Sequence, residues 1–412
     1  MRRFLAAALG IVAGVAIAGW LGRFDPPAES PTLRIVPDSG GHLRELLLHY
    51  APAGADMVVP TYRDLLAALE PDAVVHVAVE RPADFDELLE RLAHAGAEGL
   101  ERLRPLVVGR PITIWSRDRF VTTERGGRPV LTVPTARRTA VLERANDWIV
   151  PWVMAAQSTV DSRQSTVDGQ PGTLSAALVS LFPRCPAVNC RLSTVDSVAV
   201  VQAPFAFDGG DIVADEEHVY ATAALPGRNA GTRWADQGML REELVRLFDR
   251  EPVILGSSRD EVPDHHICMI VTPIGHGTVL VGDPELGLRL LREAGSPALP
   301  GGVEADSSPE TAARFARVAD GLAAAGLRVI RVPLVPTTTP FVYVSYNNVL
   351  LDDRPDGRHV FLPKFGVAVL DAAARAVWEA QGFTVHPVDV AKLYLGGGAL
   401  RCVAGVIQRT DP

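Results

Sequence analysis

The feature that most constrains the fold of this chain is a repeated alternation of short apolar runs with longer amphipathic segments, which begins near residue 33. Residues 73–80 (AVVHVAVE) form a short run rich in β-branched side chains, which predicts a strand. Residues 83–96 (ADFDELLERLAHAG) carry apolar side chains three and four positions apart, which predicts a helix with one buried face. Strands that alternate with helices in this way predict an α/β architecture.

The same alternation continues to the C-terminus. Further strands are predicted at residues 106–109, 112–115, 130–133, 327–333 and 383–387, and further helices at residues 239–249, 309–326 and 370–382. Gly326 and Gly382 stand where the last two helices end, and glycine readily closes a helix in the left-handed conformation. No strong linker interrupts the pattern, so we expect a single domain over residues 33–412.

The N-terminus has the character of an export signal. Arg2 and Arg3 precede an uncharged run over residues 4–22, and Ala16-Ile17-Ala18 offers a small-x-small cleavage pattern. The run is also just long enough to span a bilayer uncleaved. Residues 1–22 are therefore predicted to be a signal peptide or an N-terminal membrane anchor, with residues 23–32 as a tether. We expect an exported protein, secreted, periplasmic or anchored.

Composition argues against one class of partner. The 412 residues carry a net charge of −9, and a nucleic-acid-binding domain usually shows a strongly basic footprint. We therefore expect no nucleic-acid partner, and contact with a membrane only through the N-terminal segment. A mildly acidic chain suits a cationic substrate, although net charge alone does not select one.

A surface insertion is predicted near residues 155–197. The tetrapeptide STVD occurs there three times, at residues 158–161, 165–168 and 193–196, among Ser, Gln, Gly and Asp residues that favour a loop. Cys185 and Cys190 lie in the same region and could pair in an oxidising compartment. The chain shows no cysteine or histidine spacing typical of zinc sites, so no structural metal is expected.

Common nucleotide-binding and serine-hydrolase motifs are absent, but two acidic segments stand out. Trp115, Arg117 and Asp118 belong to IWSRD (residues 114–118), at the end of a predicted strand. Asp208 opens DGGD (residues 208–211), whose two glycines allow a tight turn and a close approach of the backbone to a ligand. Taken alone, the first is usually a surface ion pair, and the second is as often a plain acidic turn.

Two further segments carry nucleophilic or titratable side chains. DHHIC (residues 264–268) contains Asp264, His266 and Cys268, and it leads into an apolar run. GGGALRC (residues 396–402) contains Arg401 and Cys402, with three glycines that free backbone N–H groups near the sulfur. A lone histidine at such a junction is most often a core residue, and a lone cysteine is about as often inert and buried.

Together and in this order, the four segments resemble the pentein, or guanidino-group-modifying, superfamily, which includes arginine, agmatine and peptidylarginine deiminases, dimethylarginine hydrolases and amidinotransferases. Residues 345–366 (SYNNVLLDDRPDGRHVFLPKFG) are similar to the strand pair that precedes the last helix of that family. The resemblance covers about residues 105–409. It implies an α/β propeller of about five ββαβ units around a pseudo-fivefold axis, with the active site in the central channel.

The resemblance also implies roles for individual residues. Cys402 would be the nucleophile, His266 the general acid/base, and Asp208 a catalytic carboxylate. Asp118 would bind the guanidinium of the substrate. The remaining substrate-binding candidates from the same motifs are Trp115, Arg117, Asp264, Cys268 and Arg401.

These assignments imply a hydrolase of amidine C–N bonds that acts on an arginine-like guanidino substrate, peptidyl-arginine among the candidates, through a covalent amidino-thioether on Cys402. Carboxylates pair with the fixed N–H donors of a guanidinium, and the reaction needs no cofactor. Some relatives depend on calcium, but no calcium ligands can be identified in this sequence. The alternatives are a non-catalytic pentein that binds a ligand, and an amidinotransferase in which an amine replaces water.

The sequence departs from the family pattern at two positions. Asp208 stands where deiminases usually carry Glu, and Cys268 stands where they carry a guanidinium-binding Asp. The second change indicates a substrate other than free arginine or agmatine. If the resemblance holds, the sulfurs of Cys268 and Cys402 share one pocket, and a disulfide between them would be an oxidised off-state. The simpler interpretation is that Cys268 is a small buried filler.

Overall fold

The computed structural model describes residues 33–135, 142–164 and 198–411. The predicted leader (1–22), the tether (23–32), the Cys185–Cys190 pair and the second and third STVD copies lie outside these ranges. Within them, no helix has the length and apolar character needed to cross a membrane.

The strands form five separate sheets. The first contains β1 (Arg34–Ile35), β5 (Val121–Arg125), β6 (Arg128–Val133) and β7 (Ala199–Gln202). The second contains β10 (Glu251–Leu255), β9 (His218–Thr222) and β8 (Val213–Ala214). The third contains β11 (Val271–Pro273), β12 (Thr278–Asp283), β13 (Arg328–Pro336) and β14 (Tyr343–Ser345). The fourth contains β15 (Leu350–Arg354), β16 (Gly357–Lys364) and β17 (Phe383–Asp389). The fifth contains β18 (Ala404–Thr410), β2 (His42–His49), β3 (Val74–Val79) and β4 (Leu103–Val107).

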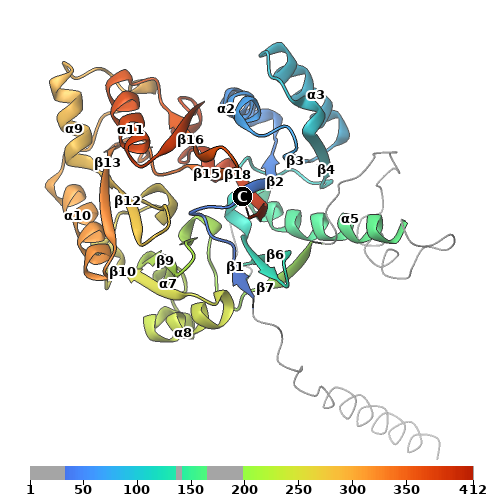
Figure 1. Ribbon diagram of the computed structural model, residues 1–412, viewed down its shortest axis with the longest axis horizontal. Coiled ribbons are helices and arrows are strands. Elements are labelled where there is room, and N and C mark those ends of the chain that lie inside the picture. Colours follow the sequence, from blue (N-terminus) through green and yellow to red (C-terminus); the bar gives the residue numbers. More distant parts are fainter. Residues whose placement is uncertain (1–32, 136–141, 165–197, 412) are drawn as a thin grey trace, which may run out of the picture.

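One pairing pattern recurs in all five sheets. An antiparallel pair is followed by a helical connection and a strand parallel to the second member, as in β11–β12–β13 and β15–β16–β17. Parallel neighbours need such a crossover, because a tight turn cannot join them. The fifth sheet pairs β18, from the C-terminus, with β2, from the start of the described chain. Figure 1 shows the five sheets around a common centre near β18, with the helices outside.

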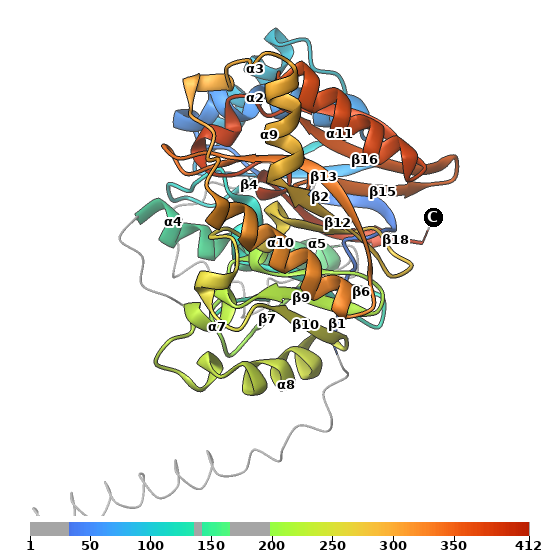
Figure 2. The ribbon, with the colours of Figure 1, turned by 90° about the vertical axis from the view of Figure 1, so that its left-hand side faces the viewer.

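The longer helices pack against the strands of the sheets. They are α2 (Ala55–Ala68), α3 (Pro82–His94), α5 (Val150–Gln164), α8 (Gln237–Phe248), α9 (Pro284–Glu293), α10 (Pro309–Ala324) and α11 (Ala368–Ala380). Two short helices, α4 (Leu142–Asn146) and α7 (Ala224–Arg228), carry residues of the candidate active site. Figure 2 shows α9 and α10 lying across the strands of the third sheet. Short 3-10 turns connect the elements, and four of them carry the candidate active site.

Most predicted elements are present in the structure. Residues 73–80 form β3 and residues 83–96 form α3, each within two residues of the expected ends. The predicted strand at residues 112–115 is wrong, because the segment follows Pro111, which lacks an N–H, and the backbone N–H of Thr113 donates to the Asp147 carboxylate rather than to a neighbouring strand (2.7 Å).

Residues 155–164, which the sequence predicts to begin a surface loop, are helical, because α5 continues through the first STVD copy to Gln164. The rest of the predicted insertion, residues 165–197, lies outside the described residues. Residues 152–164 contain no Gly or Pro, so nothing in that stretch interrupts a helix.

Candidate active site

Four short 3-10 turns carry the four segments singled out in the sequence. They are η3 (Ser116–Arg119), η5 (Gly209–Asp211), η8 (Ile267–Met269) and η11 (Leu400–Val403). Contacts join η11 to η3, η3 to η5 and η5 to η8. Segments that lie far apart along the chain therefore meet at one place, as the order of the motifs predicted.

Glycines allow these four turns to pack so closely. A Cβ added to Gly209 would lie 2.1 Å from the carbonyl oxygen of Arg117, and one added to Gly210 would lie 2.6 Å from Nδ1 of His266. A Cβ on Gly398 would approach the Sγ of Cys402 to 3.1 Å. The glycines were predicted to bring the backbone close to a ligand, but in the structure they bring the turns close to one another.

Cys402 is a buried free thiol, with only 4% of the residue exposed. Its Sγ lies 3.6 Å from Oδ1 of Asn348 and 4.0 Å from Sδ of Met269. A hydrogen bond with Cys268 and the neighbouring His266 hold its pKa well below the usual value, although burial acts in the opposite direction. The thiolate, which is the nucleophilic form, is therefore favoured.

Cys268 is the second buried free thiol of the site. Its hydrogen bond with Cys402, together with burial, raises its pKa well above the usual value, so it remains a neutral donor beside the thiolate. The side-chain amide of Asn348 donates to its sulfur at 3.3 Å. The two thiols interact with each other, and both are free, so the hypothesised disulfide between them is not formed in the structure.

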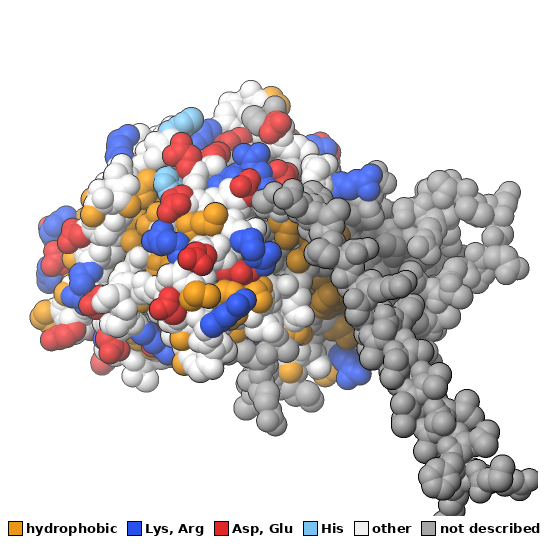
Figure 3. All heavy atoms as spheres, turned by 90° about the horizontal axis from the view of Figure 1, so that it is seen from below, with side chains coloured by type: hydrophobic (Ala, Val, Ile, Leu, Met, Phe, Trp, Pro, Cys, Tyr) orange, Lys and Arg blue, Asp and Glu red, His pale blue; other side chains and the backbone are white. Residues whose placement is uncertain are grey.

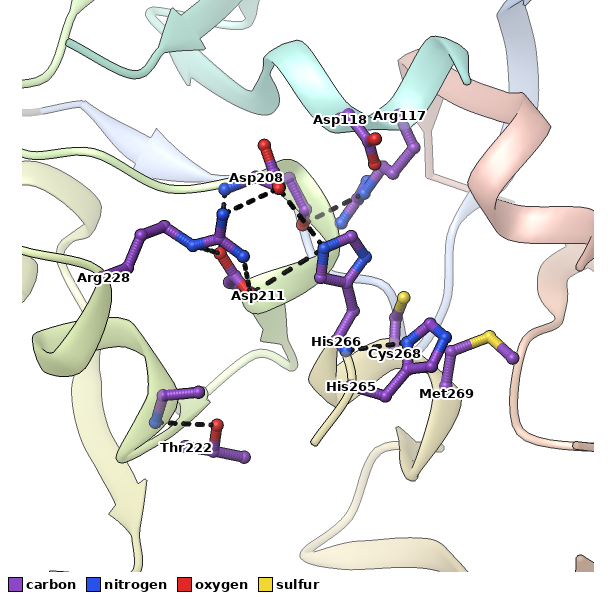
Figure 4. A network of polar contacts seen from close by, with 12 residues as sticks. Arg117, Asp118, Asp208, Asp211, Thr222, Arg228, His265, His266, Cys268 and Met269 are labelled. Atoms are coloured by element: carbon purple, nitrogen blue, oxygen red, sulfur yellow. Dashed lines mark hydrogen bonds and ion pairs between the residues drawn. The ribbon is translucent and has the colours of Figure 1, made fainter. Parts of the chain in front are cut away.

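His266 lies between the acids and the sulfurs. Its Nε2 is 3.4 Å from Oδ2 of Asp208 and 4.0 Å from Oδ1 of Asp211. Figure 4 shows the imidazole between these carboxylates and Cys268. Burial alone would lower its pKa, but hydrogen bonds to Asp208 and Cys402 raise it well above 6.5. The ring is thus an imidazolium at neutral pH and can donate a proton.

The two carboxylates predicted to bind a guanidinium already contact guanidinium groups of this chain. Asp118 lies 2.8 Å from Nη2 of Arg144. Asp208 lies 3.1 Å from Arg119, 3.3 Å from Arg144 and 2.9 Å from Arg228. None of these three arginines was identified from the sequence. Arg119 directly follows Asp118 in η3, and this adjacency is a signal that could have found it, whereas Arg144 on α4 and Arg228 on α7 belong to no local motif.

The environments of the two carboxylates differ. Burial and the charge of Asp208 raise the pKa of Asp118 to about 6. Burial would also raise the pKa of Asp208, but His266, Arg228 and Arg119 hold it below its ordinary value. Asp208 is therefore ionised throughout the neutral range, whereas Asp118 titrates at its acidic edge.

The other predicted residues lie around this centre in different roles. Arg117 is buried and donates to the carbonyl oxygens of Gly209 (3.3 Å) and Ile212 (3.2 Å), so it joins η3 to η5. Trp115 packs over the glycine run of residues 396–398. Arg401 is buried and forms an ion pair with Asp38.

A pocket of about 530 Å³ opens beside the site. Asp264 stands on its rim in an exposed ion pair with Arg259 at 2.5 Å. The other lining residues among those described are Asp211, Ala224, Gly227, Arg228, His265, His266, Phe341 and Gly397. Asp211 and His266 line the pocket, whereas Cys402, Asp118 and Asp208 are not among its lining residues.

Three residues have an arrangement that could in principle hold a metal. Ligand atoms of Asp208, Asp211 and His266 lie within 4.8 Å of one another. Three arginines already surround Asp208 and supply positive charge at this place.

Two sequence comparisons gave no relatives: neither a protein-family model nor a curated protein sequence matches the chain. Solved structures do match. An agmatine deiminase of C. jejuni is 12% identical, covers 93% of this chain and 98% of its own, and has a TM-score of 0.60. A C-to-S variant of that enzyme with substrate bound is 11% identical, with 94% and 99% covered and a TM-score of 0.61. An agmatine deiminase of Enterococcus faecalis is 14% identical, with 93% and 98% covered and a TM-score of 0.59.

These likenesses extend over almost the whole of each chain. At such low identity they establish the fold and leave the chemistry to the residues of the site. The chain therefore has the mixed α/β fold of these agmatine deiminase structures, as the resemblance implies.

Proposed function

We propose that this protein is a cysteine-dependent hydrolase of a guanidino compound, with Cys402 as nucleophile, His266 as general acid/base, and Asp118 and Asp208 as the guanidinium-binding carboxylates. The observation that carries the proposal is the convergence of a low-pKa buried thiol and a high-pKa imidazole beside paired carboxylates. Perturbed groups of this kind, gathered next to a pocket, are typical of active sites.

The shared fold supports the same reaction class. In one of the matched structures, serine replaces a cysteine and substrate is bound, as expected where that cysteine reacts. We propose further that the five sheets form the pentein-type propeller about a pseudo-fivefold axis. The recurring antiparallel–helix–parallel pattern supports it.

In the first half of the proposed reaction, the Cys402 thiolate adds to the central carbon of the guanidinium to give a neutral tetrahedral adduct. The His266 imidazolium protonates one nitrogen, the C–N bond breaks, and ammonia or an amine leaves. A cationic amidino-thioether remains on the sulfur. The carboxylates hold the planar group against the thiolate, and such positioning can lower a barrier by several kcal/mol.

In the second half, water takes the place of the departed nitrogen. Neutral His266 accepts a proton from the water as its oxygen bonds to the carbon. The new adduct expels the Cys402 thiolate, and the hydroxyl proton passes to solvent as the ureido product forms. Acceptance of an amine in place of water would make the protein an amidinotransferase.

One observation favours the second candidate, a non-catalytic binding protein. Cys402 is almost completely buried, and three arginines of the chain contact the carboxylates that a substrate would need. A thiol that no ligand reaches would be inert.

An assay of ureido products separates the two candidates. Arginine, agmatine, methylated arginines, γ-guanidinobutyrate and arginyl peptides are offered to the wild type and to the Cys402→Ala and Arg91→Ala variants, the latter a surface control on α3. Product from the wild type and from Arg91→Ala, but not from Cys402→Ala, supports the hydrolase. A wild type no better than Cys402→Ala on any compound, with or without an amine acceptor, supports the binding protein.

The finer assignments are proposals as well. We propose that the protein acts without a cofactor, on a small guanidino molecule or an arginyl chain, and that it is exported through residues 1–22. The described part of the face in Figure 3 shows acidic and basic side chains interspersed, which agrees with the proposal that nucleic acid is no partner.

A further inference from the structure

Arg144 lies where a substrate guanidinium would be expected to bind. One nitrogen of its guanidinium, Nη2, lies 2.8 Å from Oδ2 of Asp118 and 3.3 Å from Oδ2 of Asp208. It thus bridges the two carboxylates through charge-assisted contacts of the kind that a substrate would make. Its side chain is 31% exposed, so the position is open to exchange with a ligand.

The backbone around Arg144 is anchored to the rest of the site. Nη2 of Arg119 donates to the carbonyl oxygen of Arg144 at 3.2 Å. The amide of Asn146 donates to the carbonyl oxygen of Pro111 at 2.8 Å, and the Asp147 carboxylate accepts the Thr113 backbone N–H at 2.7 Å. Helix α4 is therefore tied to the segment before η3. The contact of Arg144 follows from this placement and is not a chance position of a long surface side chain.

The charges of the centre balance without any substrate. The acidic groups are Asp38, Asp118, Asp147, Asp208, Asp211 and the Cys402 thiolate, and the basic groups are Arg117, Arg119, Arg144, Arg228, Arg401 and the His266 imidazolium. A purely cationic ligand would take both carboxylates from Arg144 and leave its guanidinium without these two partners, close to the positive charge of the ligand.

We infer that Arg144 determines specificity, because its own guanidinium occupies the place where a substrate guanidinium would bind. The preferred ligands are then guanidino acids, whose anionic group pairs with the displaced Arg144. The inference rests on the proposed function for the identity of the site. A guanidino acid brings one positive and one negative charge and leaves the balance unchanged. Arg228, which lines the pocket and is 28% exposed, is a second cation within reach of such an anion.

A binding experiment on non-reacting protein tests the inference separately from catalysis. Calorimetric titrations use the Cys402→Ser protein with three probes: guanidinium chloride, agmatine and γ-guanidinobutyrate. The last two have similar length and differ in a terminal ammonium or carboxylate. We expect γ-guanidinobutyrate to bind at least about tenfold more tightly than agmatine, because it restores a partner to Arg144.

Removal of the Arg144 guanidinium should reverse the preference. In Cys402→Ser/Arg144→Ala, we expect guanidinium and agmatine to bind about tenfold more tightly or better, and the advantage of the guanidino acid to disappear. Arg144→Met keeps the apolar stem and serves as a second variant should the alanine variant not fold. The matched control is Arg91→Ala, which removes an arginine that pairs with Glu87 on the surface of α3 at 2.8 Å and should leave all three affinities unchanged.

Two results would overturn the inference: an affinity ratio that is the same with and without Arg144, or no binding of any probe in either background. Failure of the proposed function looks different. In that case the binding preference changes as described, yet the protein with its native Cys402 yields no ureido product from any guanidino compound.

Discussion

Two buried carboxylates of this molecule, Asp352 and Asp208, both contact arginine, but they are held in different ways. Asp352 is almost fully buried and accepts hydrogen bonds from the backbone N–H of Leu43 (2.7 Å), Nδ1 of His42 (3.0 Å) and Nε of Arg354 (2.6 Å). Backbone and buried neighbours fix that network, and it joins β2 to β15. The Asp352 network is therefore a structural one.

Asp208 has partners of another kind. Four side chains converge on it, namely Arg119, Arg144, Arg228 and His266. Two of these side chains, Arg144 and Arg228, are partly exposed, and they can exchange with a ligand without breaking a sheet. Burial of a charged side chain therefore does not show whether it serves the fold or the function. Asp208 differs from Asp352 because a ligand can replace its partners.

The largest expected effect is that of Cys402→Ala, which removes the proposed nucleophile. Loss of the nucleophile should lower kcat/KM by about a thousandfold or more, since effects of this size follow removal of a covalent catalyst. The melting temperature should change little, because the substitution removes only a sulfur. Rates of ureido formation and a thermal melt measure both. A variant that retains the wild-type rate would remove Cys402 from the mechanism.

The next largest effect is expected on the stability of the fold, at the Asp352 network. Asp352→Ala leaves Arg354 without its 2.6 Å carboxylate partner in a buried position, and breaking a buried pair typically costs about 3–5 kcal/mol. Urea unfolding measures the loss. Asp208→Ala should cost clearly less stability while it abolishes turnover, because its partners can move toward solvent. Equal losses of stability for the two variants would erase the distinction between the two networks.

The pH dependence sharpens the comparison within the site. Asp118 must be ionised to bind a guanidinium, and its pKa is raised to about 6 by burial and by Asp208. As the pH falls through this value the carboxylate is protonated, so kcat/KM should decrease, by about tenfold per pH unit once well below it. In Asp118→Asn the residual activity should lose this acidic limb. An acidic limb that persists in the variant assigns it to another group.

The smallest effect is expected at the surface. The Arg91–Glu87 pair on α3 is exposed, so Arg91→Ala should leave both turnover and the melting temperature within experimental error. A measurable loss of turnover would show that a change on the surface of α3 affects the active site. Arg91→Ala would then be unsuitable as a control.

Local regularities allowed much of the fold to be predicted. The β-branched run of residues 73–80 and the three-and-four spacing of residues 83–96 needed no tertiary information. Residues 112–115 show the limit of this approach, because the backbone N–H of Thr113 pairs with Asp147, a side chain 34 positions away. An apolar run predicts burial, but the partner of its N–H groups decides whether it is a strand.

The α/β alternation can be read from the sequence alone, and so can the chemical types and the order of the groups that meet in the active site. Periodicity and glycine runs are short-range features, and they can be read along the chain even where identity to known structures is only 11–14%. The positions of Arg119, Arg144 and Arg228 around Asp208, in contrast, follow from tertiary packing. These arginines come from separate elements 89, 64 and 20 positions away from it, and proximity of that kind arises from packing, which leaves no local pattern along the chain.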